Sequence, residues 1–226
     1  MIELIVKVLA SYLVGSLIGS LIVGRLRGGV DIRMLGSGNA GGTNALRTQG
    51  KWFALWVMII DIGKGILATR VIAPLSLQGL GLVGVSAGGG VNVGDLREWL
   101  PVACGLAAMV GHVYPVWHGF RGGKGVATLV GVVFGVEPVL LLVVLLVWFA
   151  VAMLSGFVGL ASIVAASAVA VFVAVSGMQP QVPLLAFGMA VAMLIAFTHR
   201  SNIARMRAGT EPRARKLWLL GRGREG

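Results

Sequence analysis

Long apolar runs separated by short polar segments make up most of this chain. The apolar runs lie at about residues 2–24, 52–73, 101–117, 126–136, 139–155, 157–176 and 184–198. Several of them approach or exceed the ~18–20 apolar residues that an α-helix needs to cross a bilayer. The continuous run at 139–150 does not alternate as a membrane β-barrel strand would. The pattern therefore predicts an all-α polytopic membrane protein.

Basic residues predict the orientation of these helices. The segment 25–51 carries five Lys and Arg, and residues 199–226 carry eight, including a basic tail at about 206–226. Such segments stay on the cytoplasmic side of a membrane. If the short run at 126–136 also crosses, the count is about seven transmembrane helices, with the N-terminus outside and the C-terminus cytoplasmic. Its eleven residues span only ~16 Å of a ~30 Å hydrocarbon core. The alternative is five spans with two re-entrant or interfacial segments.

Composition narrows the class further. With 57% hydrophobic and 12% charged residues among 226, the chain does not have the composition of an ordinary soluble domain. We expect one integral membrane domain over residues 1–226, with a glycine-rich outer loop at 79–94. The net charge of +11 is concentrated in loops, which indicates membrane topology and anionic lipid headgroups rather than nucleic acid. A single cysteine, Cys104, excludes an internal disulfide and a multi-cysteine metal site.

Three polar segments at the ends of apolar runs carry the candidate chemistry. They are residues 36–47, 119–128 and 199–205, here called the first, second and third polar segments. Each combines a cation with small or glycine-rich backbone, and these are the parts from which phosphate sites are made. The predicted topology places all three on the cytoplasmic face. They therefore indicate a phosphorylated substrate handled at a lipid surface.

The first polar segment offers short polar side chains and one forked cation. Ser37, Asn39 and Asn44 are candidate ligands, four glycines let backbone amides approach a ligand, and Arg47 suits a phosphate or carboxylate. The alternative is a flexible loop between two membrane helices, because glycine and asparagine are common in loops.

The second polar segment precedes the apolar run that starts near Val126. Gly122 and Gly123 with Lys124 predict an anion site of backbone amides and one ammonium group at a helix N-terminus. The nucleotide-binding pattern G-x-x-x-x-G-K-[ST] is not met, because His118 replaces its first glycine and Gly125 follows the lysine. The plain-loop alternative remains open here too.

The third polar segment and the second apolar run carry the remaining candidates. His199 and Asn202 are three residues apart and share a helix face, with Arg205 following. The alternative is that these cations only anchor the last helix at the headgroups. Asp61 and Lys64 lie inside a predicted span, where ionisable groups are costly, and we expect them to pair with each other.

The residue types exclude several kinds of catalysis. His112, His118 and His199 match neither zinc-hydrolase spacing nor the H-x-x-x-x-D acyltransferase pattern. The three polar segments contain no G-x-S-x-G elbow, and the match to this pattern at 84–88 falls in the predicted glycine-rich outer loop. We interpret a lone His112 as a packing residue. Donors and cations without a nucleophile suit direct transfer between two bound substrates, where orientation and electrostatics supply the rate.

Three motifs resemble the signatures of the bacterial acyl-phosphate:glycerol-3-phosphate acyltransferase family. They read G-S-G-N-x-G-x-T-N-x-x-R at 36–47, G-H-x-x-P-x-x-x-G-F-x-G-G-K-G-V-A-T at 111–128 and H-R-x-N-I-x-R-x-x-x-G-T-E at 199–211, and D-x-x-K-G at 61–65 is similar to the family as well. The resemblance implies that Ser37, Arg47, Lys124, His199 and Asn202 surround two phosphate groups. Supporting roles fall to Asp61, Lys64, His112 and Glu211. Gly42 departs from the alanine usual in the family.

The family resemblance also implies the reaction and its setting. A bacterial inner-membrane enzyme would transfer an acyl group from acyl phosphate to the sn-1 hydroxyl of glycerol 3-phosphate, giving lysophosphatidic acid and phosphate at the cytoplasmic face. No cofactor, metal, acyl-CoA or acyl carrier protein would take part, and function would be coupled to an enzyme that makes acyl phosphate. The proton acceptor is the substrate's own phosphate or His199. The competing class is a transporter of phosphorylated solutes, which would show repeated halves that this chain lacks.

Overall fold

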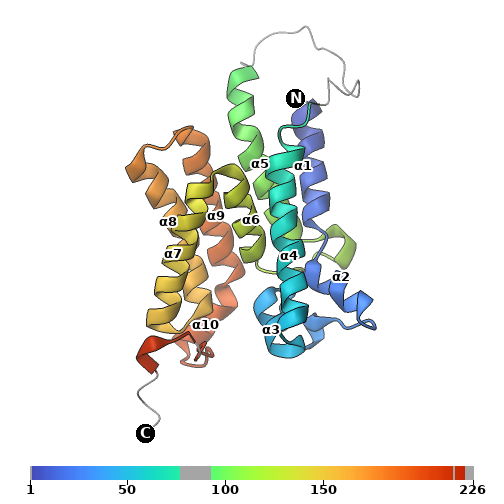
Figure 1. Cartoon of the computed structure of the whole chain (residues 1–226), viewed down its shortest axis with the longest axis vertical. Helices are drawn as coiled ribbons and strands as arrows, with labels where there is room; N and C mark the ends of the chain where they lie inside the picture. Colours follow the sequence, from blue (N-terminus) through green and yellow to red (C-terminus); the bar gives the residue numbers. More distant parts are fainter. Residues whose placement is uncertain (1, 77–92, 216, 222–226) are drawn as a thin grey trace. The chain divides into compact units, whose positions relative to one another are not determined.

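The computed structural model describes residues 2–76, 93–215 and 217–221, and within these ranges it contains helices and connecting segments but no strand (Figure 1). The described α-helices are α1 Ile2–Gly15, α2 Gly19–Leu26, α3 Gly42–Gln49, α4 Lys51–Leu67, α5 Val93–Val113, α6 Val126–Val136, α7 Pro138–Ser155, α8 Val158–Ser176, α9 Gln181–Thr198 and α10 Arg200–Arg207. Shorter turns are η1 Ile32–Met34, η2 Ala68–Ile72, η3 Val116–His118 and η4 Leu219–Gly221.

The predicted helices are present, with two differences. The run at 2–24 is not one helix, because the chain breaks after α1 and α2 continues at a 46° bend. The glycine-rich loop predicted at 79–94 lies outside the described residues, apart from its last two positions, which begin α5. Four of the described helices are long and apolar enough to cross a membrane, or five if the bent α1–α2 pair is one span. The seven-helix count and the orientation stay predictions.

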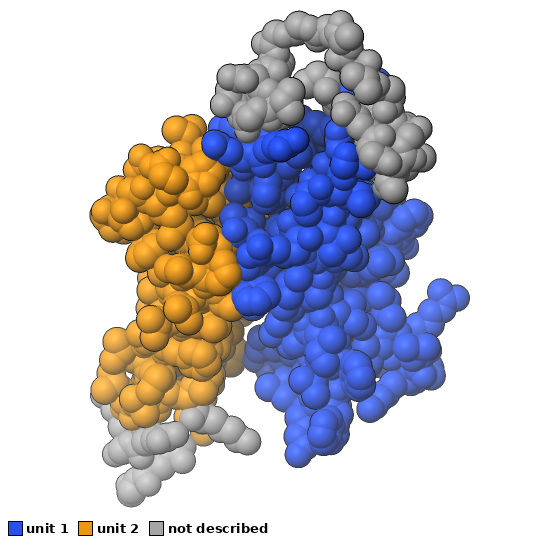
Figure 2. All heavy atoms as spheres, turned by 45° about the horizontal axis from the view of Figure 1, so that its top comes forward, with its two compact units in different colours: residues 1–136 blue, residues 137–226 orange. Residues whose placement is uncertain are grey.

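The chain divides into two compact units, residues 1–136 and 137–226 (Figure 2). Unit 1 contains α1–α6 and the first two polar segments. Unit 2 contains α7–α10 and the third polar segment. Each unit is described by itself, and the single domain expected over residues 1–226 stays a prediction.

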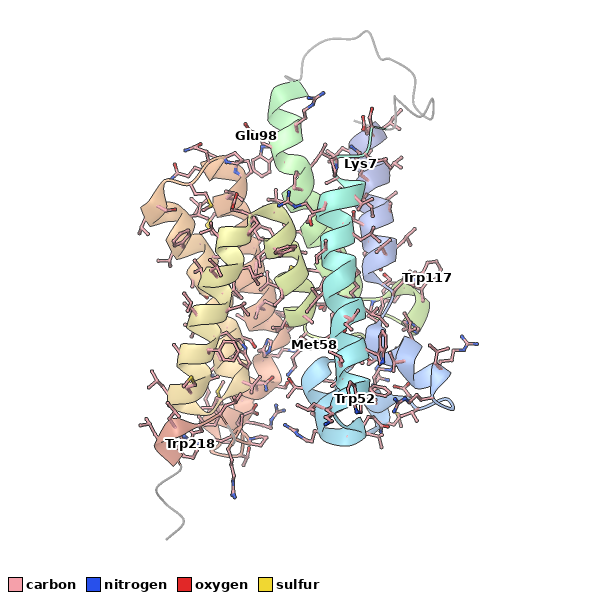
Figure 3. The ribbon with its side chains drawn as sticks, viewed as in Figure 1. Lys7, Trp52, Met58, Glu98, Trp117 and Trp218 are labelled. Atoms are coloured by element: carbon pink, nitrogen blue, oxygen red, sulfur yellow. The ribbon has the colours of Figure 1, made fainter. Side chains whose placement is uncertain are left out.

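Two exposed tryptophans flank the first two polar segments. Trp52 and Trp117 are 62% and 58% exposed, and Figure 3 shows Trp52 toward the end of unit 1 opposite Lys7 and Trp117 about midway along it. Trp52 follows the first polar segment and Trp117 precedes the second. Tryptophan is enriched where a membrane meets water. The exposed ring of Trp52 therefore favours an interfacial position for the first polar segment.

Glycines let the helices of unit 1 approach closely. A Cβ on Gly65 of α4 would lie 2.5 Å from the Thr128 oxygen and 2.8 Å from the Val132 nitrogen of α6. Gly131 of α6 is packed in the same way against the backbone oxygen of Ile62. Small residues at such contacts are typical of packed membrane helices. The contact fixes the first half of α6 against the C-terminal end of α4.

We expect Gly65→Ala to lower the free energy of unfolding by about 1–3 kcal/mol, because its methyl group would collide with backbone atoms that cannot rotate away. Gly63→Ala is the matched control on the same helix, since a Cβ there meets nothing within 4 Å. The control should be neutral or stabilising by up to about 1 kcal/mol. Apparent melting temperatures of the purified variants in detergent test this. Equal melting of the two variants would contradict the packing argument.

Candidate functional site

The break between α1 and α2 opens onto a buried cluster of three ionisable side chains. Asp61 and Lys64 on α4 are 0% and 4% exposed, and His112 near the end of α5 is 2% exposed. Lys64 Nζ lies 3.0 Å from Asp61 Oδ1, so the predicted pairing of these two residues is confirmed. The resemblance also gave His112 a supporting role, and its ring belongs to the same cluster.

Hydrogen bonding fixes the form of each group in this cluster. Lys64 Nζ donates to the Leu17 oxygen at 2.8 Å and to His112 Nδ1 at 2.7 Å, and it reaches Asp61 Oδ1. Those three partners use the three hydrogens of the ammonium group. Since Nδ1 accepts, the neutral His112 ring carries its hydrogen on Nε2. The amide of Gly19, exposed by the helix break, donates to Asp61 Oδ1 at 3.1 Å.

The second polar segment is built on His112. The amides of Gly122 and Gly123 donate to the oxygens of Val113 and His112 at 3.1 and 3.0 Å. A Cβ on Gly123 would collide with His112 Nε2. In this structure both glycine amides donate to backbone oxygens, and both glycines are closely packed. Their predicted role in binding phosphate stays a prediction.

Lys124 follows these glycines at the entry to α6. It is half-buried, and Gly125 has a φ of +86° immediately before the helix begins at Val126. The first amides of an α-helix have no partner within the helix and carry the positive end of its dipole. Lys124 and the first turn of α6 therefore form the cationic donor group of this segment.

The first polar segment contains one buried side chain that holds the loop together and several side chains that reach the surface. Asn44 is 1% exposed; its Oδ1 accepts from the Ser37 amide, and its Nδ2 lies 3.0 Å from the oxygens of Ile32, Leu35 and Asn39. The side-chain amide of Asn44 thus organises the loop, and its predicted role as a phosphate ligand stays a prediction. By contrast, Ser37 and Arg47 are exposed and Asn39 is half-buried.

Gly42 has a partner in α4. A Cβ at this position would lie 2.7 Å from Met58 Sδ, so the methionine fills the space of the missing methyl group. Met58 is labelled in Figure 3 on α4, beside α3. The departure from alanine at position 42 therefore leaves no gap at the start of α3.

Arg33 connects η1, which precedes the first polar segment, to the chain at His118 and Arg121. From the sequence it is counted only among the five basic residues of 25–51. Its Nη1 donates to the oxygens of His118 and Arg121 at 3.2 and 3.0 Å, while Asp31 holds its Nε and Nη2. The Arg33 hydrogen bonds lower the pKa of Asp31, and Asp31 in turn raises the pKa of Arg33. A D-x-R spacing is the only signal in the sequence, and it does not reveal the distant backbone acceptors.

We expect Arg33→Ala to lower the free energy of unfolding by about 1–2 kcal/mol at neutral pH, because two backbone hydrogen bonds and one ion pair are lost. Asp31 has a depressed pKa, so its contribution is complete above the ordinary aspartate pKa and is lost as pH falls through the lowered value. The difference in melting temperature between wild type and variant should therefore narrow in acid. Exposed Arg25 supplies the Arg25→Ala control, and a pH-independent difference would contradict the assignment.

The third polar segment has its own buried arrangement in unit 2. His199 is 4% exposed and its Nδ1 lies 2.8 Å from the Ile195 oxygen. A carbonyl oxygen only accepts, so Nδ1 carries the hydrogen and Nε2 of the neutral ring is the basic nitrogen. Asn202 Nδ2 donates to Glu211 Oε1 and Arg205 Nε to Glu211 Oε2, both at 2.6 Å. Glu211 thus orients both predicted ligands of this segment.

The two units therefore hold the predicted residues in two groups. Unit 1 brings the cluster of Asp61, Lys64 and His112 beneath the turn that precedes Lys124. Unit 2 holds the third polar segment with Glu211. The prediction that all three segments serve one site concerns both units and stays a prediction. Among the described residues, no group of three or more His, Cys, Asp or Glu side chains is placed to hold a metal ion.

The chain is similar to known proteins over nearly its whole length. The family model described as Glycerol-3-phosphate acyltransferase matches residues 5–209. A glycerol-3-phosphate acyltransferase of Chlorobium phaeobacteroides (strain BS1) is 41% identical, over 95% of this chain and 98% of the relative. One of Synechococcus sp. (strain CC9902) is 40% identical over 89% of this chain and 90% of the relative.

Solved structures give the same similarity. A crystal structure of PlsY (YgiH), an integral membrane glycerol 3-phosphate acyltransferase, in its glycerol 3-phosphate form superposes with a TM-score of 0.75 at 36% identity, covering 93% of this chain and 94% of that chain. The lysophosphatidic acid form of the same protein has a TM-score of 0.75 at 34% identity, covering 95% and 97%.

Proposed function

The chain belongs to the glycerol-3-phosphate acyltransferase family, and from this premise we propose that it acylates glycerol 3-phosphate with an acyl phosphate as donor. It is an acyltransferase, and membership of the family places it in phospholipid biosynthesis. The observation that carries the choice of donor is Lys124 just before α6, where a cation and the positive end of the helix dipole suit a second phosphate besides that of glycerol 3-phosphate.

The proposed reaction is a direct transfer. The sn-1 hydroxyl oxygen attacks the carbonyl carbon of the acyl phosphate, a new carbon–oxygen ester bond forms, and the bond from that carbon to the phosphate oxygen breaks. The hydroxyl proton passes to a base, and the products are lysophosphatidic acid and inorganic phosphate. No residue of the chain is acylated. The three polar segments contain no G-x-S-x-G nucleophile motif, which supports this route.

Each candidate residue has a role in this proposal. Lys124 stabilises negative charge on the carbonyl oxygen and on the leaving phosphate. Arg47 and Ser37 bind the phosphate of glycerol 3-phosphate, and both are exposed on the first polar segment. His199 and Asn202 bind the same phosphate from the third polar segment, in which Glu211 orients Asn202. Asn39 and Arg205 are further phosphate ligands, and the Asp61–Lys64–His112 cluster supports the turn before Lys124.

The proton acceptor is the substrate's own phosphate, because an acyl phosphate is activated and does not need a strong base. His199 is the protein-based alternative, since its Nε2 is the basic nitrogen of the ring. A His199→Ala variant separates the two. If it mainly raises KM, the substrate phosphate accepts the proton. If it mainly lowers kcat and removes the fall of the rate at low pH, His199 accepts it, because a general base is inactive when protonated.

The setting follows the same proposal. The protein lies in the bacterial inner membrane, and the polar segments face the cytoplasm, where its function is coupled to an enzyme that makes acyl phosphate. Four apolar helices of spanning length and the exposed Trp52 and Trp117 support a membrane position. No cofactor, metal, acyl-CoA or acyl carrier protein takes part in the transfer.

The deciding experiment incubates purified protein with radiolabelled glycerol 3-phosphate and one donor at a time. We expect labelled lysophosphatidic acid when acyl phosphate is the donor. We expect none when the acyl group is carried on coenzyme A or on acyl carrier protein. Product with acyl-CoA alone would overturn the donor while keeping the reaction. The transporter alternative is tested in liposomes loaded with inorganic phosphate, where uptake of label without lysophosphatidic acid would replace the proposal.

A further inference from the structure

The chain after Glu211 is fastened to the turn between α7 and α8. Arg213 Nη1 donates to the Ser155 oxygen at 3.0 Å, and the Ala214 amide donates to the Gly156 oxygen at 2.8 Å. The guanidinium carbon of Arg213 lies 4.5 Å from the ring centroid of Phe157 and 4.1 Å from that of Trp218. One cation thus joins an aromatic ring of the turn to an aromatic ring of the tail.

Gly156 allows the tail to pack closely on the α7–α8 turn. It has a φ of +76°, and a Cβ there would lie 3.0 Å from Trp218 Cγ and 3.1 Å from Arg213 Cβ. A glycine is required both by the backbone conformation and by the close approach of the tail. The α7–α8 turn is therefore shaped to receive Arg213 and Trp218, and a bulkier residue at position 156 would displace both.

The same end of α8 also carries the third polar segment. A Cβ on Gly159, in the first turn of α8, would lie 2.9 Å from Asn202 Cβ, so Asn202 packs directly on that glycine. Glu211, whose side chain is 6% exposed, joins Asn202 and Arg205 and is only two residues from Arg213. The first turn of α8 therefore contacts Asn202 directly, and the adjacent α7–α8 turn holds the chain that follows Glu211.

From this geometry we infer that Arg213 is a positioning residue for the acyl transfer. Arg213 holds the chain after Glu211 on the α7–α8 turn, and the Glu211 carboxylate thereby stays where it orients Asn202 and Arg205. Arg213 itself touches no substrate. The residue lies beyond the part of the chain that the family model matches, which ends at 209. The inference rests on the proposed role of the third polar segment in binding glycerol 3-phosphate.

Arginine is needed here for its shape as well as its charge. The planar guanidinium group stacks on aromatic faces and donates from a fixed fork, whereas a lysine ammonium is a point charge on a flexible chain. Arg213→Lys should therefore fail to restore the arrangement although it keeps the charge. This separates a positioning role from a general attraction of the basic tail to anionic lipid, which a lysine would serve equally well.

The test variants are Arg213→Ala, Arg213→Lys and Phe157→Leu. The control is Arg207→Ala, which removes an exposed arginine on α10. We expect the first three to raise KM for glycerol 3-phosphate by about tenfold with a smaller change in kcat, because a ligand group is misplaced rather than removed. The KM for the acyl donor should stay unchanged. Arg207→Ala should behave as wild type. Assays in neutral detergent and in vesicles of anionic lipid are run in parallel.

Each outcome decides the inference. Unchanged kinetics in Arg213→Ala, full activity in Arg213→Lys, or a loss confined to anionic vesicles and shared by Arg207→Ala would overturn it. Phe157→Leu keeps the test valid if an Arg213 variant does not fold. Wild-type protein that forms no lysophosphatidic acid with any donor would instead overturn the proposed function, so the two failures are distinguishable.

Discussion

Lys64→Met is expected to lower the free energy of unfolding by about 3–5 kcal/mol, because it leaves the Asp61 carboxylate buried without its counter-charge. The loss extends beyond the pair. Lys64 Nζ also donates hydrogen bonds to the Leu17 oxygen, at the break between α1 and α2, and to His112 Nδ1. Both acceptors lose these hydrogen bonds in the variant. An uncompensated charge inside a membrane protein has little access to water, which makes the penalty larger than for a surface pair.

A single cysteine gives a direct measurement of this effect. Cys104 on α5 is buried in unit 1 and is the one cysteine among the 226 residues, so labelling by a thiol-reactive dye on heating reports the opening of that unit. Lys51→Met on the same helix is the control, since Lys51 is exposed. Lys64→Met with Asp61→Leu should recover part of the lost stability, because no buried charge remains unpaired. Equal melting of Lys64→Met and Lys51→Met would show that the pair does not stabilise the fold.

The helices and one ion pair follow from the sequence, whereas the rest of the cluster does not. Apolar run length fixes most of the predicted spans, and a spacing of three places Asp61 and Lys64 on one helix face. The participation of His112 depends on how α5 packs against α4. The participation of Gly19 depends on a break within a run that is apolar on both sides. Neither packing nor the break has a local signal.

The candidate site, too, follows only in part from the sequence. Composition indicates that the first and second polar segments are rich in donors, but it does not reveal which donors the loop itself consumes. Asn44 organises the first segment, and the amides of Gly122 and Gly123 are taken by the end of α5. Arg33 was missed because its acceptors are backbone oxygens more than 80 positions away. Residue type predicts what a group can bind, and only the fold determines what it does bind.

Lys124→Met should lower kcat/KM for acyl transfer by about 10²–10³ with little change in melting temperature, because it removes one preorganised positive group while keeping the length of the side chain. The turn that carries Lys124 is held by hydrogen bonds to the backbone of α5 and by packing on the His112 ring. The effect should therefore appear in catalysis and not in folding. Arg47→Ala should act differently, mainly by raising KM for glycerol 3-phosphate, since that residue is proposed to bind the acceptor substrate.

The kinetic pattern of these two variants tests the assignment of substrates to segments. Initial rates are measured while each substrate is varied in turn, with Lys51→Met as a control that removes an exposed lysine outside the site. A loss in Lys124→Met that depends on the acyl phosphate concentration, together with a loss in Arg47→Ala that depends on glycerol 3-phosphate, supports the proposed roles. The reverse pattern would show that Lys124 binds glycerol 3-phosphate and Arg47 binds acyl phosphate. Undiminished kcat/KM in either variant would remove that residue from the site, because a cation that stabilises transferred charge cannot be lost without a slower reaction.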